Sequence, residues 1–374
     1  MDSSGQKRKF PIDWLLLGPS VLLSLFGLVT MFSFTEDNAF FNKQAAWILL
    51  GLTAFLIFSL IDWRFLRRSG VIVWVYLTSA IMLTLLFVLG SVTRGAQSWF
   101  DLGAFSFQPV DLAKVALILI LSKYFSRRHI EIRHVRHIVV SGIYTLIIFL
   151  LVLLQPDFGS SIIILCLWLG IILLSGISKK QLFYVLGIGV LVAVLMWQFV
   201  FRDYQKARIV SFIHPLADIR GAGYNAYQST VAVGSGELIG KGIGYGTQSK
   251  LKFLPEYQTD FIFASFAEEW GFTGVIVVLS LYGTLIFRLL YVARRGESNF
   301  ETLFCLGVSV LLLSHITINV GMNIGLLPVT GITLPFMSYG GSHLLAEFVS
   351  LGIVSGMNRY SRTIARSELD HQVL

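Results

Sequence analysis

Long uninterrupted apolar runs, separated by short polar connections, extend along the whole chain. A membrane-spanning helix needs about 20 mostly apolar residues, and ten runs meet or approach that length. The runs lack the alternation at every second residue that a membrane β-barrel requires. We therefore expect a single all-α, multi-pass membrane domain over residues 1–374, with about ten transmembrane helices near residues 13–34, 44–61, 71–90, 110–125, 138–154, 159–176, 182–201, 261–291, 303–325 and 342–358.

The composition excludes a water-soluble fold. Hydrophobic residues make up 55% of the chain and charged residues 13%, whereas a soluble domain carries roughly 25% charged residues. So much apolar surface requires a lipid bilayer as its solvent.

The basic residues predict which side of the membrane each connection faces. Of the 29 Lys and Arg residues, 17 lie in the two terminal segments and in every second short connection. Short connections that are rich in Lys and Arg face the cytoplasm. We therefore expect both termini in the cytoplasm, and we attribute the net charge of +8 to topology rather than to nucleic-acid binding.

The connection at about residues 202–260, between the seventh and eighth predicted helices, departs from this pattern on the outer side. Long loops are exempt from the orientation rule, yet so much positive charge indicates an anionic ligand outside the membrane. The connection is rich in glycine, but its spacing does not match a nucleotide-binding P-loop. Its seven basic residues are Arg202, Lys206, Arg208, Arg220, Lys241, Lys250 and Lys252.

Two acidic residues, Glu256 and Asp260, precede the eighth predicted helix in the run FLPEYQTDFIFA. Asp260 lies where loop becomes helix, so it can cap the helix or complement the helix dipole. The alternative is a general base, placed against a reacting hydroxyl at the membrane surface.

Other polar residues lie in or beside the predicted spans, where ionisable groups are functional candidates. Asp111 and Lys114 share one face of the fourth helix, either as a structural ion pair or as a clamp for phosphate. Asp157 is expected to cap the sixth helix. His315 and Asn319, with Asn323, form a row on one face of the ninth helix that suits a network of hydrogen bonds.

Several long motifs resemble the SEDS family (shape, elongation, division and sporulation) over essentially the whole chain. They are QPDFGSS, RIVSF, GYNAYQS, GSGELIGKGIGYGTQSKLKFLPEYQTDFIFA and GLLPVTGITLPFMSYGGS. The run INVGMNIGLLPVTGI is more similar to RodA, the elongation branch, than to FtsW, the division branch.

The resemblance implies a peptidoglycan glycosyltransferase of the cytoplasmic (inner) membrane. Such an enzyme polymerises lipid II into glycan strands at the outer face and works with a class B penicillin-binding protein, which supplies the transpeptidase. Asp260 matches the family's catalytic acid, Glu256 matches the acid of a preceding proline-glutamate pair, and Lys114 matches a functionally sensitive lysine. The family usually reads QPSE where this chain reads QPVD, so Asp111 is one methylene shorter than the usual acid.

The implied reaction inverts the configuration at the donor sugar, since an α-linked pyrophosphate is replaced by a β bond. A single base then suffices, because pyrophosphate leaves as a stable anion, unlike the two-carboxylate scheme of glycosidases. The growing negative charge needs cationic partners. No protein metal site is apparent and no cofactor is firmly implied, although a divalent cation could assist. The residues expected to bind substrate are Arg94, Asp111, Lys114, Asp157, Arg208, Lys241, Lys252, His315 and Asn319.

Three alternatives stay open at this point. The chain could serve division or sporulation with the same chemistry, flip lipid II across the membrane, or act as a scaffold for a transpeptidase. A transporter would carry polar residues through to the cytoplasmic side, whereas the polar residues here gather at the outer side.

Overall fold

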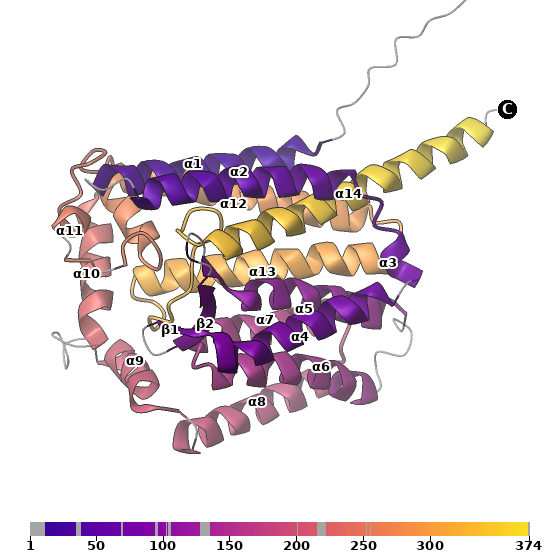
Figure 1. The fold of residues 1–374 in the computed structure, drawn as a ribbon, viewed down its shortest axis with the longest axis horizontal. Helices are drawn as coiled ribbons and strands as arrows, with labels where there is room; N and C mark the ends of the chain where they lie inside the picture. The colour runs from indigo at the N-terminus through magenta and orange to yellow at the C-terminus, as the bar shows by residue number, and fades with distance from the viewer. Residues whose placement is uncertain are drawn as a thin grey trace, which may run out of the picture.

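The computed structural model describes residues 12–34, 39–68, 70–93, 96–101, 103, 106–127, 135–199, 201–214, 222–251, 253–254 and 256–372. Within these ranges ten long helices form one bundle, and each overlaps one of the segments expected from the sequence (Figure 1). The helices are α1 (Trp14–Phe34), α2 (Ala39–Leu60), α4 (Val71–Leu89), α5 (Pro109–Ser126), α6 (Val135–Leu154), α7 (Phe158–Leu174), α8 (Lys179–Phe199), α12 (Ile262–Arg294), α13 (Asn299–Asn323) and α14 (Gly341–Gln372).

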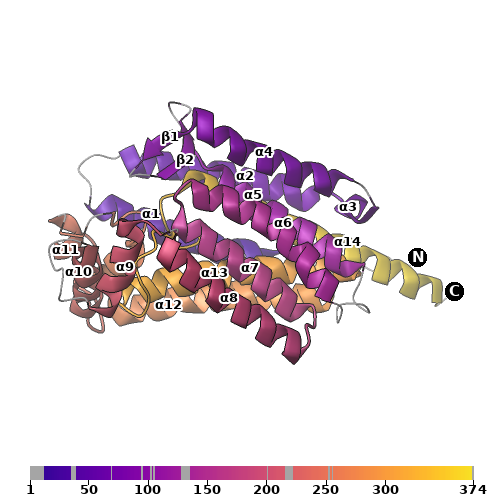
Figure 2. The same ribbon diagram turned by 90° about the horizontal axis from the view of Figure 1, so that it is seen from below.

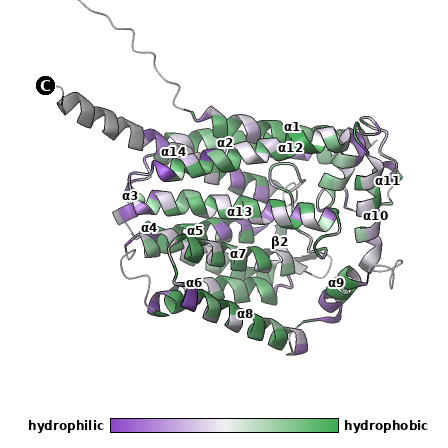
Figure 3. Cartoon of the chain, turned by 180° about the vertical axis from the view of Figure 1, so that it is seen from behind, coloured by the Kyte–Doolittle hydropathy of each residue, from purple (hydrophilic) through white to green (hydrophobic). Residues whose placement is uncertain are grey.

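Seven helices of the described chain are long and apolar enough to cross a membrane, namely α1, α2, α4, α6, α8, α12 and α13. The apolar helix α7 is shorter, with 17 residues. Both α5 and α14 carry buried charged side chains, which lowers their overall hydropathy. In Figure 3 hydrophobic colour dominates the long helices, and hydrophilic colour is concentrated at α3 (Phe65–Arg68), α9 (Asp203–Ile213) and helix ends.

The helices pack around α13, which contacts α5, α7 and α12. On one side α1 packs along α12, and α2 packs along α14 (Figures 1 and 2). The helix α8 lies at the edge of the bundle, and its most apolar stretch has no buried residue.

A small antiparallel sheet lies at one end of the bundle, on the left in Figure 1. Its strands are β1 (Ser91–Thr93), β2 (Ala96–Asp101) and β3 (Ser106–Phe107), in the order β1-β2-β3. Phe100 pairs with Phe107, and β3 leads directly into α5. The all-α expectation therefore holds except for this sheet, whose strands are too short to show a period in the sequence.

The polar connection expected at residues 202–260 is partly helical. It contains α9, α10 (Ala222–Ser235) and the single turn α11 (Thr247–Lys250), and all three lie at the same end as the sheet (Figure 1). We call this the sheet end of the bundle, and the end that carries α3 the opposite end.

The glycine-rich segment after α10 packs against a kink in α12. At the kink Gly271 has φ 64° and ψ −167°, a conformation that only glycine adopts readily. Around it the Lys241 N–H donates to the Glu268 carbonyl at 3.0 Å, and the Phe272 N–H donates to the Glu237 carbonyl at 2.9 Å. The glycines thus permit close contact between two backbones.

We predict that Gly271→Ala destabilises the protein by several kcal/mol, because the left-handed backbone alone costs about 1–3 kcal/mol. The added Cβ would also lie 2.3 Å from the Gly240 nitrogen. Thermal unfolding of the detergent-purified protein measures the effect. The control is Gly283→Ala in the same helix, where a Cβ meets no atom within 4 Å; equal unfolding temperatures for the two variants would contradict the prediction.

Candidate functional site

A cavity of about 240 Å³ opens at the sheet end of the bundle. Its walls come from β2, α5, α7, α9, α13, α14, the turn at residues 256–261 and the segment at residues 330–340. Six of the residues expected to form the site line it: Asp111, Lys114, Asp157, Arg208, Asp260 and His315.

The turn at residues 256–261 places Asp260 just before α12. The N-cap of α12 is Phe261, and this helix has no side-chain cap. Asp260 therefore precedes the N-cap position by one residue, and its carboxyl group lines the cavity.

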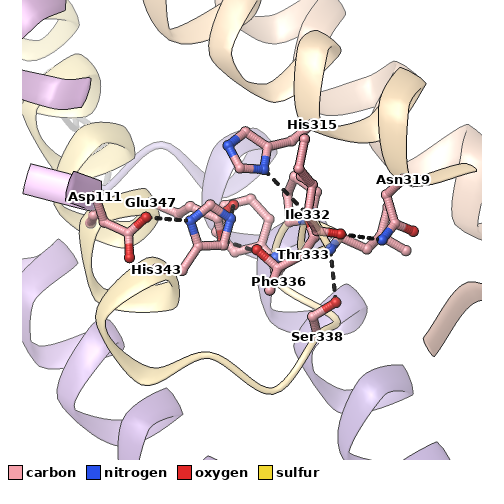
Figure 4. A network of polar contacts seen from close by, with 12 residues as sticks. Asp111, His315, Asn319, Ile332, Thr333, Phe336, Ser338, His343 and Glu347 are labelled. Carbon is pink, nitrogen blue, oxygen red and sulfur yellow. Dashed lines mark hydrogen bonds and ion pairs between the residues drawn. The ribbon is translucent and has the colours of Figure 1, made fainter. Parts of the chain in front are cut away.

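Two asparagines of α13 fix the backbone of this acid. The Asn319 Nδ2 donates to the Ile332 carbonyl oxygen at 2.6 Å (Figure 4). It also donates to the Asp260 carbonyl oxygen at 2.9 Å. The Asn323 Nδ2 donates to the same Asp260 carbonyl at 3.1 Å. The polar row expected on this helix is confirmed as a hydrogen-bond network, and it connects Asp260 to the segment that carries Ile332.

The segment at residues 330–340 is also bonded to the turn through main-chain atoms. The Tyr339 N–H donates to the Gln258 carbonyl at 2.8 Å, and the Ser338 hydroxyl donates to the Thr259 carbonyl at 2.6 Å. Burial raises the pKa of the Tyr339 hydroxyl above its ordinary value, so this cavity residue remains protonated and able to donate.

The side chains of Asp260 and Arg208 approach the same point of the cavity wall, at Gly331. A Cβ at this glycine would lie 3.5 Å from the Asp260 Oδ2 and 3.9 Å from the Arg208 Nη1. The backbone there has φ 74°, which favours glycine. The absence of a side chain leaves the carboxylate and the guanidinium facing one small volume.

Deeper in the cavity a chain of buried charged residues connects α5 with α14 (Figure 4). The Lys114 Nζ lies 3.1 Å from the Asp111 Oδ1, which confirms the expected contact on one face of the helix. The His343 Nδ1 lies 3.2 Å from the same oxygen. The His343 Nε2 lies 3.0 Å from the Glu347 Oε1.

Asp157 combines two contacts at the rim. Its Oδ1 accepts from the Ser160 N–H at 3.0 Å, which confirms the expected cap of α7. Its Oδ2 accepts from the Gln108 Nε2 at 3.1 Å, so the cap also joins α7 to the start of α5.

Comparison with known proteins shows to which family the chain belongs. Residues 10–363 match the family model of FtsW, RodA and SpoVE, which is described as cell cycle protein. The chain belongs to the SEDS family.

Similar SEDS proteins are known from several bacteria. The peptidoglycan glycosyltransferase MrdB of Escherichia coli is 34% identical over 98% of this chain and 100% of its own length. The probable peptidoglycan glycosyltransferase FtsW of Bacillus subtilis is also 34% identical, over 93% of this chain and 91% of its own length.

Solved SEDS structures share the fold. The rod shape determining protein RodA of Thermus thermophilus has a TM-score of 0.70 at 30% identity, with 93% of this chain and 97% of that chain covered. A chain from a study of how a peptidoglycan synthase complex coordinates polymerization and crosslinking has a TM-score of 0.81 at 30% identity, with 94% of this chain and 99% of that chain covered.

Some expected SEDS site residues lie away from the cavity. Among the described residues, Lys241 contacts Glu268 at 2.7 Å and Thr247 at 3.0 Å, and it does not line the cavity. Glu256 does not line it either; its carboxylate accepts from the Thr259 hydroxyl at 3.1 Å, and its φ of 55° shapes the turn. Arg94 and Lys252 lie outside the described residues.

Sequence reasoning missed two residues of the site, His343 and Glu347. Both lie four residues apart in a predicted span, so the rule that flags ionisable residues in membrane helices would have found them. Asp111, the partner of His343, is more than 200 positions away, which the sequence pattern does not reveal.

We predict that Asn319→Ala lowers the rate of the SEDS reaction by about 10²-fold, since misplacing a reacting group by 1 Å has effects of that size. The substitution removes the bond to the Asp260 carbonyl and leaves the bond from Asn323. The measurement is kcat of glycosyl transfer at saturating substrate. The matched control is Asn299→Ala at the far end of α13, and equal rates for the two variants would contradict a positioning role.

Proposed function

We propose that the protein is a peptidoglycan glycosyltransferase that polymerises lipid II at the outer face of the cytoplasmic membrane. The names of its SEDS relatives support this activity. The observation that carries the proposal is the convergence of Asp260 and Arg208 on Gly331, in a cavity that also holds Lys114.

In this mechanism Asp260 is the general base of a single displacement. The acceptor sugar hydroxyl loses its proton to the Asp260 carboxylate while its oxygen attacks the anomeric carbon of the donor. The bond from that carbon to the pyrophosphate oxygen breaks on the opposite face, so the configuration inverts. The lipid pyrophosphate leaves with the electron pair.

Cationic groups stabilise the charge that develops on the leaving group. The Arg208 guanidinium is suited to this because its planar fork matches phosphate oxygens. Lys114 supplies a second positive charge deeper in the cavity. His315 and Asn319 hold the surrounding wall through the Thr333 and Ile332 carbonyls, at 3.2 Å and 2.6 Å.

We also propose that all ten long helices span the membrane, with both termini in the cytoplasm and the sheet end outside. The basic connections of the sequence support this orientation. A lipid-linked sugar in the outer leaflet then reaches the cavity directly. Cysteine labelling of intact cells at Tyr245→Cys, an exposed position at the sheet end, tests it.

A class B penicillin-binding protein is the proposed partner. The similar chain from a peptidoglycan synthase complex supports a joint polymerisation and crosslinking assembly. Cell elongation is the proposed process, because MrdB matches over its whole length, although the division protein FtsW is equally identical.

The deciding experiment incubates the purified protein and its partner with fluorescent lipid II and separates glycan strands on a gel. We expect strands of many disaccharides, and the same assay with EDTA decides whether a divalent cation assists. Flipping of lipid II by proteoliposomes without any polymer would instead support a transporter.

A further inference from the structure

The buried charges behind the cavity form an ordered row that the proposed mechanism does not use in full. From the cavity inward the charged side chains lie in the order Lys114, Asp111, His343 and Glu347. The nitrogen–oxygen distances between successive side chains are between 3.0 and 3.2 Å. The exposed fractions of the four residues are 3%, 3%, 7% and 2%. Acid and base alternate along the row.

Geometry indicates that His343 carries a positive charge. Each ring nitrogen lies within 3.2 Å of a carboxylate oxygen. An unprotonated Nδ1 would direct its lone pair at the Asp111 oxygen, so this position favours N–H, and the Glu347 carboxylate beside Nε2 favours the cationic ring. The contact to Glu347 has an ion-pair distance but an angle that is poor for a hydrogen bond, which makes it mainly electrostatic.

The surroundings of His343 leave these two acids as its counterions. On α5 it faces Asp111 and Lys114, and on its own helix it faces Glu347. The centroid of the His315 ring, on α13, lies 4.5 Å from the centroid of the His343 ring. The His315 Nδ1 lies 3.2 Å from the Thr333 carbonyl oxygen. A buried carboxylate without a cation costs several kcal/mol, so Glu347 and the imidazolium need each other.

Glu347 is fixed from its other side. Its Oε2 accepts from the Phe336 N–H at 2.9 Å (Figure 4). Phe336 has a φ of 61°, a left-handed conformation that is rare for an aromatic residue. The acid therefore has a defined position at the base of the segment that forms the cavity wall.

The row divides into a cavity side and a rear side. Asp111, Lys114 and His343 line the cavity, whereas Glu347 does not. The three lining groups carry one net positive charge, and the balancing negative charge lies behind them. We propose that His343, held by Glu347, is a positioning residue that draws on the Asp111 carboxylate and thereby keeps the Lys114 ammonium available to a pyrophosphate in the cavity.

This inference rests on the proposed function, and it predicts a specific pattern of weakened binding. In His343→Gln, Lys114 is the remaining cation beside the Asp111 carboxylate, which then neutralises the Lys114 charge. The affinity for a lipid pyrophosphate therefore falls about tenfold, or about 1.4 kcal/mol. Glu347→Gln removes the counterion of the imidazolium, so the ring becomes neutral, no longer draws on the Asp111 carboxylate, and the affinity falls by a similar factor. The double variant keeps the charge balance of the buried row and should also lose about tenfold, not a hundredfold, because both changes act on one charge.

The experiment measures two quantities for the full-length protein with its partner. One is the Kd of farnesyl pyrophosphate, a short lipid pyrophosphate, and the other is the split between KM and kcat for fluorescent lipid II. We expect KM to rise with Kd while kcat changes less. His137→Gln on α6 is the matched control, since this buried histidine does not line the cavity and bonds to the hydroxyl of Tyr124 on α5 at 2.9 Å.

Two results would overturn the inference while wild-type protein still makes polymer. One is unchanged Kd and KM in the double variant, and the other is a double effect equal to the product of the two single effects. If a single variant misfolds, the first of these results still decides the test, because it needs only the charge-balanced double variant. A wild-type protein that makes no polymer would contradict the proposed function instead.

Discussion

Asp260→Asn will abolish glycan-strand formation while leaving the protein folded and bound to its partner. The amide keeps the size of the side chain but cannot accept the hydroxyl proton, and loss of a general base lowers rates by about 10²- to 10⁴-fold. The backbone bonds from Asn319 and Asn323 to the Asp260 carbonyl do not depend on the carboxylate, so the turn should keep its position. The measurement is the initial rate of lipid II consumption.

The control for this variant is Asp203→Asn, which changes an exposed acid at the start of α9. Thermal unfolding and co-purification with the partner should match the wild type for both variants. Normal polymerisation by the Asp260 variant would refute the assignment of the base, and the acid would then have a structural role.

The second large effect concerns stability at the opposite end of the bundle. There Arg288 of α12 binds Asp13 through Nε and Nη2, with distances between 2.7 and 3.0 Å, and the Asn358 Nδ2 donates to Asp13 at 2.8 Å. The pair joins α1, α12 and α14 with little solvent access. Arg288→Met should lower the free energy of unfolding by about 3–5 kcal/mol, because it leaves a buried carboxylate without its cation.

Combining Arg288→Met with Asp13→Asn should recover much of the loss, because the unpaired charge is then removed. The measurement is unfolding of the detergent-purified protein, with the exposed Arg294→Ala as control. A double variant that is no more stable than Arg288→Met would show that the guanidinium contributes through packing rather than charge.

The helical bundle could be predicted because the membrane requires long apolar runs, and each run is visible locally. The sheet could not, since its strands are two to six residues long and are defined by pairings such as Ser91 with Trp99. The helices α9 and α10 could not be predicted either, because a polar helix lacks a long apolar run. The basic residues of the outer connection predicted an anionic ligand, and the sequence indicated no role for its glycine-rich segment, whose backbone pairs with the kink of α12.

The site was predictable where a charged residue lies in or beside an apolar run, as for Asp260, Asp111 and Lys114. What the sequence could not supply was distance across the fold. The Lys241 side chain is basic and lies in the same outer connection as Arg208, yet it binds Glu268 while Arg208 lines the cavity. Only the packing of α12 against the glycine-rich segment explains why Arg208 lines the cavity and Lys241 does not.

The bonds that hold the turn at residues 256–261 have a consequence for sequence divergence. Gln258 and Thr259 accept the hydrogen bonds from Tyr339 and Ser338 at their main-chain carbonyl oxygens, which every amino acid possesses. The main chain of the turn therefore depends on the donors that reach it, above all on Asn319, Asn323 and Ser338. Among descendants of one ancestral enzyme, we expect these three donors to persist together with the acid whose position they fix.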